Sequence, residues 1–183
     1  MIAVPRHPVG GRPRRIAAWL PLGLALLAGA GGCAYTTSTA ALPPHVKTIA
    51  IPTFENQTTE YAIELSLTQS VIDRFVADNH LKIVDEKDAD YVLRGTLKAY
   101  RNIVFGFNTA ENAQEYRVTI TVAITIKDAV KNREVWTDPD LTRYANYYVV
   151  AVPGSPAKTE FDGRAEAISK IADEILARTV QSW

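Results

Sequence analysis

The sequence is poor in the residues that build most catalytic and metal sites. It contains one cysteine, Cys33, and three histidines, of which only His45 and His80 follow residue 32. A lone cysteine cannot close an intramolecular disulfide, and two histidines argue against a histidine-based metal site. The GxSxG turn, the phosphate-binding loop and the dinucleotide-binding glycine pattern are also missing. The sequence therefore predicts a protein that is not an enzyme and needs no cofactor.

The N-terminal apolar run is too short to be a good membrane-spanning helix. It covers residues 16–30, is interrupted by Pro21, and ends in the small residues at 28–32. Four arginines and no acids precede it: Arg6, Arg12, Arg14 and Arg15. A positive segment, an apolar segment and a small-residue cleavage site are typical of a secretory signal peptide. We therefore expect residues 1–32 to be removed.

Cys33 directly follows these small residues, an arrangement that resembles a bacterial lipobox. We therefore expect acylation of the Cys33 thiol, with palmitate among the acyl chains, and hence a lipid anchor. Stable anchoring requires more than one acyl chain. Ala34 after the cysteine favours the outer membrane, by the sorting rule of similar lipoproteins. Residues 33–44, small and proline-ended, predict a flexible tether, and residues 45–183 a single domain. The alternatives are an ordinary secretory signal with an accidental cysteine, or a membrane anchor that is retained.

The charge balance after residue 32 excludes a general nucleic-acid binder. The signal segment removes four of the 20 basic residues and none of the 20 acids, which leaves 16 against 20 and a net charge of −4. Nucleic-acid-binding domains carry a basic excess instead. Basic side chains must therefore act locally, if they act at all.

Periodicity predicts an α+β fold with two helices packed on one face of a small mixed, mostly antiparallel sheet, in the order β-α-β-β-β-α. The clearest strand, 115–127, alternates apolar and polar residues, as a sheet with one wet face does. Two helical stripes repeat at three to four residues. An extended piece at 81–84 is a candidate edge strand. The expected elements are strands at 46–51, 91–101, 115–127 and 134–150, the last bent at Asp138-Pro139, and helices at 60–78 and 160–182.

Basic residues on the predicted wet face are the first candidate binding site. Arg94 and Lys98 lie four apart in one strand and therefore share a face, and we expect Arg117 beside them across the sheet. Such a row suits phosphate groups. The alternative is cross-strand pairing with nearby acids such as Glu115. The acids at 85–90 are interpreted as a solvated turn.

Aromatic residues near the strand ends are the second candidate. Amphipathic rings outside a core often mark interfaces, but these rings also fit as inward residues of the last strands. The residues are Phe105, Phe107, Tyr144, Tyr147 and Tyr148.

Five segments together resemble the LptE family of lipopolysaccharide-assembly lipoproteins: residues 33–35, 42–56, 89–95, 116–120 and 178–183. The resemblance implies a lipid-anchored protein at the periplasmic face of the outer membrane. It also implies a plug that fills and helps to assemble the LptD-type β-barrel and that contacts lipopolysaccharide. Basic residues on the sheet are implicated in that contact in relatives, and our candidates are Arg94, Lys98 and Arg117.

A second lipoprotein class shares the first strand and loop. Residues 49–56 also look like the corresponding segment of CsgG-like and LpoB-like periplasmic lipoproteins. Those proteins form secretion channels or activate peptidoglycan synthases. No pair of segments that would form a membrane-inserting hairpin stands out in the sequence, which favours the first resemblance.

Overall fold

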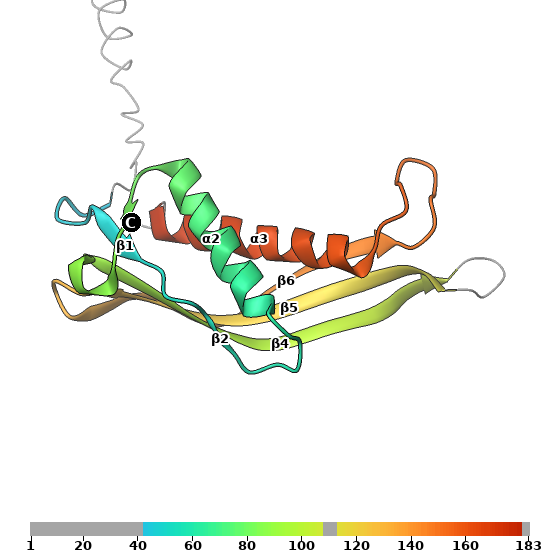
Figure 1. Cartoon of the computed structure of the whole chain (residues 1–183), viewed down its shortest axis with the longest axis horizontal. Helices are drawn as coiled ribbons and strands as arrows, with labels where there is room; N and C mark the ends of the chain where they lie inside the picture. The colour runs from blue at the N-terminus through green and yellow to red at the C-terminus, as the bar shows by residue number, and fades with distance from the viewer. Residues whose placement is uncertain (1–41, 108–112, 181–183) are drawn as a thin grey trace, which may run out of the picture. The chain divides into compact units, whose positions relative to one another are not determined.

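The computed structural model describes residues 42–107 and 113–180. Cys33 and the signal segment lie outside these ranges. In the described part, two helices pack on the same side of a sheet, and α2 crosses α3 (Figure 1). No helix in these ranges is long and apolar enough to cross a membrane. The elements are β1 (Thr48–Ala50), β2 (Glu55–Asn56), α2 (Ile63–Asp78), β3 (Lys82–Ile83), the 3-10 turn η1 (Glu86–Asp88), β4 (Tyr91–Phe107), β5 (Ala113–Asp128), β6 (Arg133–Tyr148) and α3 (Glu160–Val180).

The sheet confirms the predicted mixed, mostly antiparallel α+β class. Its strand order is β3-β1-β4-β5-β6, and β2 pairs with β4 beside this path. The long strands β4, β5 and β6 are antiparallel, whereas β1 and β2 run parallel to β4. The edge strand expected near 81–84 is present as β3. The sheet also contains a short strand that was not among the expected elements, because Glu55 and Asn56 of β2 pair with Thr96 and Leu97.

Element lengths differ from the predictions where local geometry decides them. Strand β4 continues six residues beyond the predicted end at Arg101. Strand β6 is continuous through Pro139, and the expected bend is a register shift against β5. Pro139 is tolerated because β6 is an edge strand, where a missing N–H disrupts no ladder. Helix α2 begins at Ile63 rather than residue 60, because Ala62 has a left-handed backbone with φ 57°.

The core lies between the helices and one face of β5. The alternate residues Val118, Ile120, Val122, Ile124 and Ile126 are fully buried, as the period-two pattern predicts. The helices supply the predicted stripes against them, and each fully buried aliphatic side chain contributes about 1.5–3 kcal/mol. The buried stripe residues are Ile63, Leu67, Val71 and Phe75 from α2, and Ile168, Ile171, Ala172 and Ile175 from α3.

Gly95 of β4 lies directly against an aromatic ring. The nearest register shift is at Leu97/Ala99, and the neighbour of Gly95 is Phe54 from the β1–β2 connection. A Cβ at position 95 would lie 2.5 Å from the Phe54 ring, which is 2% exposed. The ring therefore fills the space that a side chain at position 95 would occupy.

We predict that Gly95→Ala lowers the free energy of unfolding by about 1–3 kcal/mol, because overpacking displaces a buried ring. Gly106→Ala is the matched control on the same strand, since a Cβ there meets only the flexible Glu115 side chain, at 3.1 Å. Urea unfolding of both variants measures the difference. Equal losses would show that strand propensity, and not Phe54, sets the requirement for glycine.

Two aspartates, Asp90 and Asp128, form hydrogen bonds with residues 45–48, which lead into β1. The Asp90 carboxylate accepts hydrogen bonds from the backbone N–H groups of Lys47 and Thr48, at 2.8 and 3.0 Å. These bonds hold the pKa of Asp90 below its ordinary value, although burial opposes the shift. Burial alone raises the pKa of Asp128, but hydrogen bonds from the Lys131 N–H and from His45, at 3.0 Å, outweigh it and lower the pKa.

We predict that Asp90→Asn destabilises the domain at neutral pH by about 1–3 kcal/mol, because a neutral amide oxygen accepts the two backbone hydrogen bonds more weakly than the carboxylate does. A carboxyl with a lowered folded pKa contributes stability above its ordinary pKa of about 3.9 and loses it as the pH falls further. Unfolding free energies measured from neutral pH to pH about 3 should fall less steeply in the variant. Asp85→Asn, a nearby exposed carboxyl, is the control and should leave the profile unchanged.

Candidate functional site

The face of the sheet opposite the helices is largely polar and carries the candidate cations. Its central rows are hydroxyl groups, and Thr121 and Thr142 hydrogen-bond across β5 and β6 at 2.9 Å. No cluster of three or more metal-ligating side chains occurs in residues 42–107 and 113–180. The face therefore offers charge and hydrogen bonding to a polar partner.

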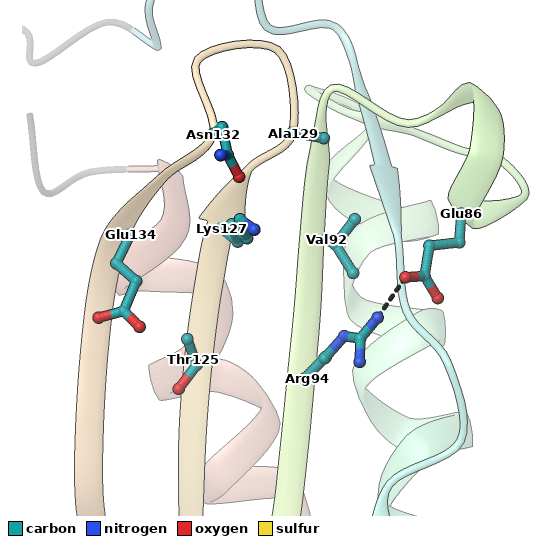
Figure 2. Close-up of a pocket in the computed structure, with 8 residues that line it drawn as sticks. All are labelled: Glu86, Val92, Arg94, Thr125, Lys127, Ala129, Asn132 and Glu134. Carbon is teal, nitrogen blue, oxygen red and sulfur yellow. Dashed lines mark hydrogen bonds and ion pairs between the residues drawn. The ribbon is translucent and has the colours of Figure 1, made fainter.

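A hollow of about 460 Å³ opens on this face at the end where β4 begins (Figure 2). Figure 2 shows the Glu86 carboxylate of η1 reaching toward the Arg94 guanidinium, with which it forms an ion pair. Lys127 and Glu134 line the same hollow, and neither has an ion pair within the described ranges. The other lining residues are Val92, Thr125, Ala129 and Asn132. The hollow thus combines one paired and one free cation with hydroxyl and amide groups.

Lys98 lies further along β4 and is held from β6. Its ammonium forms an ion pair with Asp140 at 2.7 Å and donates to the Pro139 carbonyl at 3.2 Å. Both partners are at the surface, so the pair contributes about 0–1 kcal/mol. Lys98 is therefore available to a stronger anionic partner at little energetic cost.

Arg117 lies between two aromatic rings. Its guanidinium carbon is 3.5 Å from the centroid of Phe105 and 4.3 Å from that of Tyr144. Its Nε donates to the Asn146 side chain at 2.8 Å, and Asn146 donates to Glu115 at 2.8 Å. Cation–π contacts of this kind orient a cation while leaving its charge in place.

The three cations do not form the single row that the sequence suggested. Arg94 faces Thr125 on β5, whereas Arg117 faces Ile103 on β4, so the expectation that Arg117 lies beside Arg94 is wrong. Eight residues of β5 separate Thr125 from Arg117, which corresponds to about 26 Å of strand. The cations therefore form two groups, Arg94 with Lys98 and Arg117 alone.

The five aromatic candidates divide between surface and core. Phe105, Phe107 and Tyr144 are exposed by 48%, 67% and 52%, while Tyr147 is buried at 3%. Tyr147 stacks on Tyr116 with centroids 5.5 Å apart, so it is an inward residue. Tyr148 is half-buried. The interface and core interpretations are thus each right for part of the set.

The acidic segment is a turn with one structural exception. Residues 85–88 are exposed around η1, as predicted, but Asp90 binds the backbone of the β1 segment and is not a solvated turn residue. Sequence reasoning missed Asn132 and Glu134 as lining residues of the hollow. Asn132, with a φ of 49°, lies in the β5–β6 turn, and Glu134 lies on β6 opposite Lys127, so the strand pairing brings both residues to the hollow.

The chain matches the family model described as "LptE: Lipopolysaccharide-assembly" over residues 46–180. Among solved structures, it is similar to protein XCC0632 from Xanthomonas campestris, with 12% identity, a TM-score of 0.52, and coverage of 76% of this chain and 90% of that one. It is also similar to hypothetical protein CT253 from Chlamydia trachomatis, with 10% identity, a TM-score of 0.50, and coverage of 73% and 95%. Rare lipoprotein B from Shewanella oneidensis aligns with 18% identity and a TM-score of 0.44, covering 72% and 93%. No curated protein matches in sequence. At these identities the first two structures support the fold alone.

Proposed function

The chain belongs to the LptE family of lipopolysaccharide-assembly proteins, and from that membership we propose that it plugs an LptD-type β-barrel, helps it to assemble, and serves lipopolysaccharide transport to the cell surface. The match of the family model over residues 46–180 carries this proposal. It covers nearly all of the domain expected at 45–183, including both helices and all six strands.

The proposed location is the periplasmic face of the outer membrane. Cys33 is the acylated residue in this proposal, residues 1–32 are the signal peptide and residues 33–44 are the tether. The tether would join the domain at His45, next to the contacts of Asp90 and Asp128 with the β1 segment. A force on the lipid anchor would therefore act on β1 and on the adjoining ends of β4 and β5.

The physical requirements of a plug agree with the fold. The lumen of an outer-membrane barrel is polar, so a plug needs a rigid core and a polar surface that can pair with it. The threonine rows on β5 and β6 and the hollow around Arg94 supply that surface. The fully buried face of β5 supplies the rigidity.

We predict that affinity purification of the lipidated protein from native outer membranes recovers a large β-barrel protein in stoichiometric amount. Mass spectrometry of the eluate identifies it, and an untagged strain controls for nonspecific membrane proteins. Recovery of a peptidoglycan synthase, or of a homo-oligomeric ring without a barrel, would contradict the proposal and favour the CsgG-like or LpoB-like class.

We also propose that Arg94, Lys98 and Arg117 contact the anionic groups of lipopolysaccharide. Each is half-buried or exposed on the open face, and each is held by weak surface interactions that a multivalent anion can replace. The separation of Arg117 from the other two means that one small anion cannot bridge all three. A large glycolipid that carries several anionic groups can contact both groups of cations at once.

Reversal of these three residues to glutamate should weaken lipopolysaccharide binding about tenfold, if each surface contact contributes about 0.5 kcal/mol. The effect should shrink as the salt concentration rises, because exposed charges are screened. The control reverses Arg74, Lys158 and Lys170 to glutamate, which changes the net charge by the same amount. These three side chains form ion pairs with acids of α3. Equal weakening by both variants in a binding titration would show that only net charge matters.

A further inference from the structure

The far end of the sheet carries a concentration of exposed apolar side chains, here called the apolar tip. Its members come from the last residues of β4 and the segment after β6: Ile103, Val104, Phe105, Phe107, Val149 and Val150, exposed by 53%, 39%, 48%, 67%, 42% and 49%. Single exposed apolar residues are ordinary, but a cluster of this kind marks an interaction site.

The strand register places these side chains together. Phe107 pairs with Ala113 across the β4–β5 ladder, and the Val149 N–H donates to the Gln114 carbonyl at 3.1 Å. Figure 1 shows β4 and β5 continuing past the loop that joins β2 to α2, so that neither helix lies over their ends. The neighbouring residues Ile103 and Val104, which lie on opposite faces of β4, are both partly exposed at this tip.

The charged residues at the tip are two arginines and one glutamate. Arg101 is exposed and has no ion pair within residues 42–107 and 113–180, and Arg117 stacks on Phe105. Glu115 pairs with Gly106 of β4, and its carboxylate accepts a hydrogen bond from Asn146. Aromatic rings beside arginines are typical of protein segments at the headgroup level of a bilayer, where the rings face hydrocarbon and the guanidinium groups face phosphate.

The number of residues between Cys33 and Leu42 limits how far the domain can lie from a lipid anchor at Cys33. Nine peptide units join Leu42 to Cys33, and fully extended they span at most about 32 Å. If Cys33 is acylated, as the proposed function holds, the domain cannot leave the membrane surface by more than this distance. Strand β4 has 17 residues and is about 55 Å long, so a domain standing upright would hold its tip out of reach.

We propose that, before the protein joins its barrel, the domain lies along the bilayer and the apolar tip inserts among lipid headgroups and the first acyl carbons. The lipid anchor at one end of β4 and the tip at the other then give two membrane contacts. The inference rests on the proposed acylation of Cys33 and goes beyond it, because a tether alone requires no contact between domain and lipid.

The test uses an environment-sensitive fluorophore on the full-length lipidated protein. Since Cys33 is the single cysteine and its thiol is consumed by acylation, Phe107→Cys introduces one labelling site. Val76→Cys on α2 is the matched control, because Val76 is exposed by 64% and Phe107 by 67%. In vesicles of phosphatidylethanolamine and phosphatidylglycerol, emission from position 107 should shift to the blue and be quenched severalfold more by brominated acyl chains than emission from position 76.

A second variant separates insertion from simple proximity. Ile103→Ser, Val149→Ser and Val150→Ser, combined with the label at 107, should remove most of the quenching while flotation with the vesicles is unchanged. Leu65→Ser, an exposed apolar residue of α2, is its control and should leave the quenching intact.

Three results would overturn the inference. Equal quenching at positions 107 and 76 in protein that floats with the vesicles would show that the tip stays in water. Shielding at 107 that occurs only after a barrel protein is added would show that the tip docks on protein. Loss of flotation in the Cys33→Ser variant, while the protein that retains Cys33 floats, supports the lipid anchor. Failure of the protein that retains Cys33 to float would contradict both the anchor and this inference.

Discussion

The burial of one face of β5 under two helices determines most of this structure. Five alternate residues from Val118 to Ile126 are fully buried, and they require a continuous apolar cover on one side only. Helix α3 packs directly on β5 and β6, and helix α2 packs on α3 and completes the same core. Because the opposite face is left without a cover, it must be polar or bind a partner, and the candidate cations lie there.

Several carbonyl groups of the edge strand β6 already accept hydrogen bonds from side chains or from the following segment. The carbonyls of Thr142 and Tyr144 on β6 accept hydrogen bonds from Arg143 and Lys170, at 2.7 and 3.1 Å. The Tyr148 carbonyl accepts a hydrogen bond from the Lys158 N–H at 2.7 Å, and Pro139 interrupts the strand. Such features discourage the addition of a foreign strand. This edge is compatible with the proposed plug role, because it does not compete for pairing with the strands of a barrel.

The open face has different chemistry at its two ends. Near the start of β4, the hollow around Arg94 and Lys127 is polar and mixed in charge. At the far end, Arg117 lies among aromatic rings beside the apolar tip. An amphiphile with anionic groups and hydrocarbon chains meets complementary surfaces at both ends, which fits the assembly of a glycolipid better than the binding of a small soluble ligand.

Local pattern in the sequence determined the α+β class, both helical stripes, the buried face of β5 and the family, because periodicity and short motifs depend only on neighbouring residues. The tertiary structure alone decided the register. Bulges at Leu97/Ala99 and beyond Val104 shift β4 against β5, and the strand pairing places Arg117 about 26 Å from the Arg94 partner. It also decided that Phe54 fills the space above Gly95, that Asp90 binds the β1 backbone, and that Tyr147 is buried while Phe107 is exposed. These outcomes depend on contacts between residues far apart in the chain, which a one-dimensional pattern does not encode.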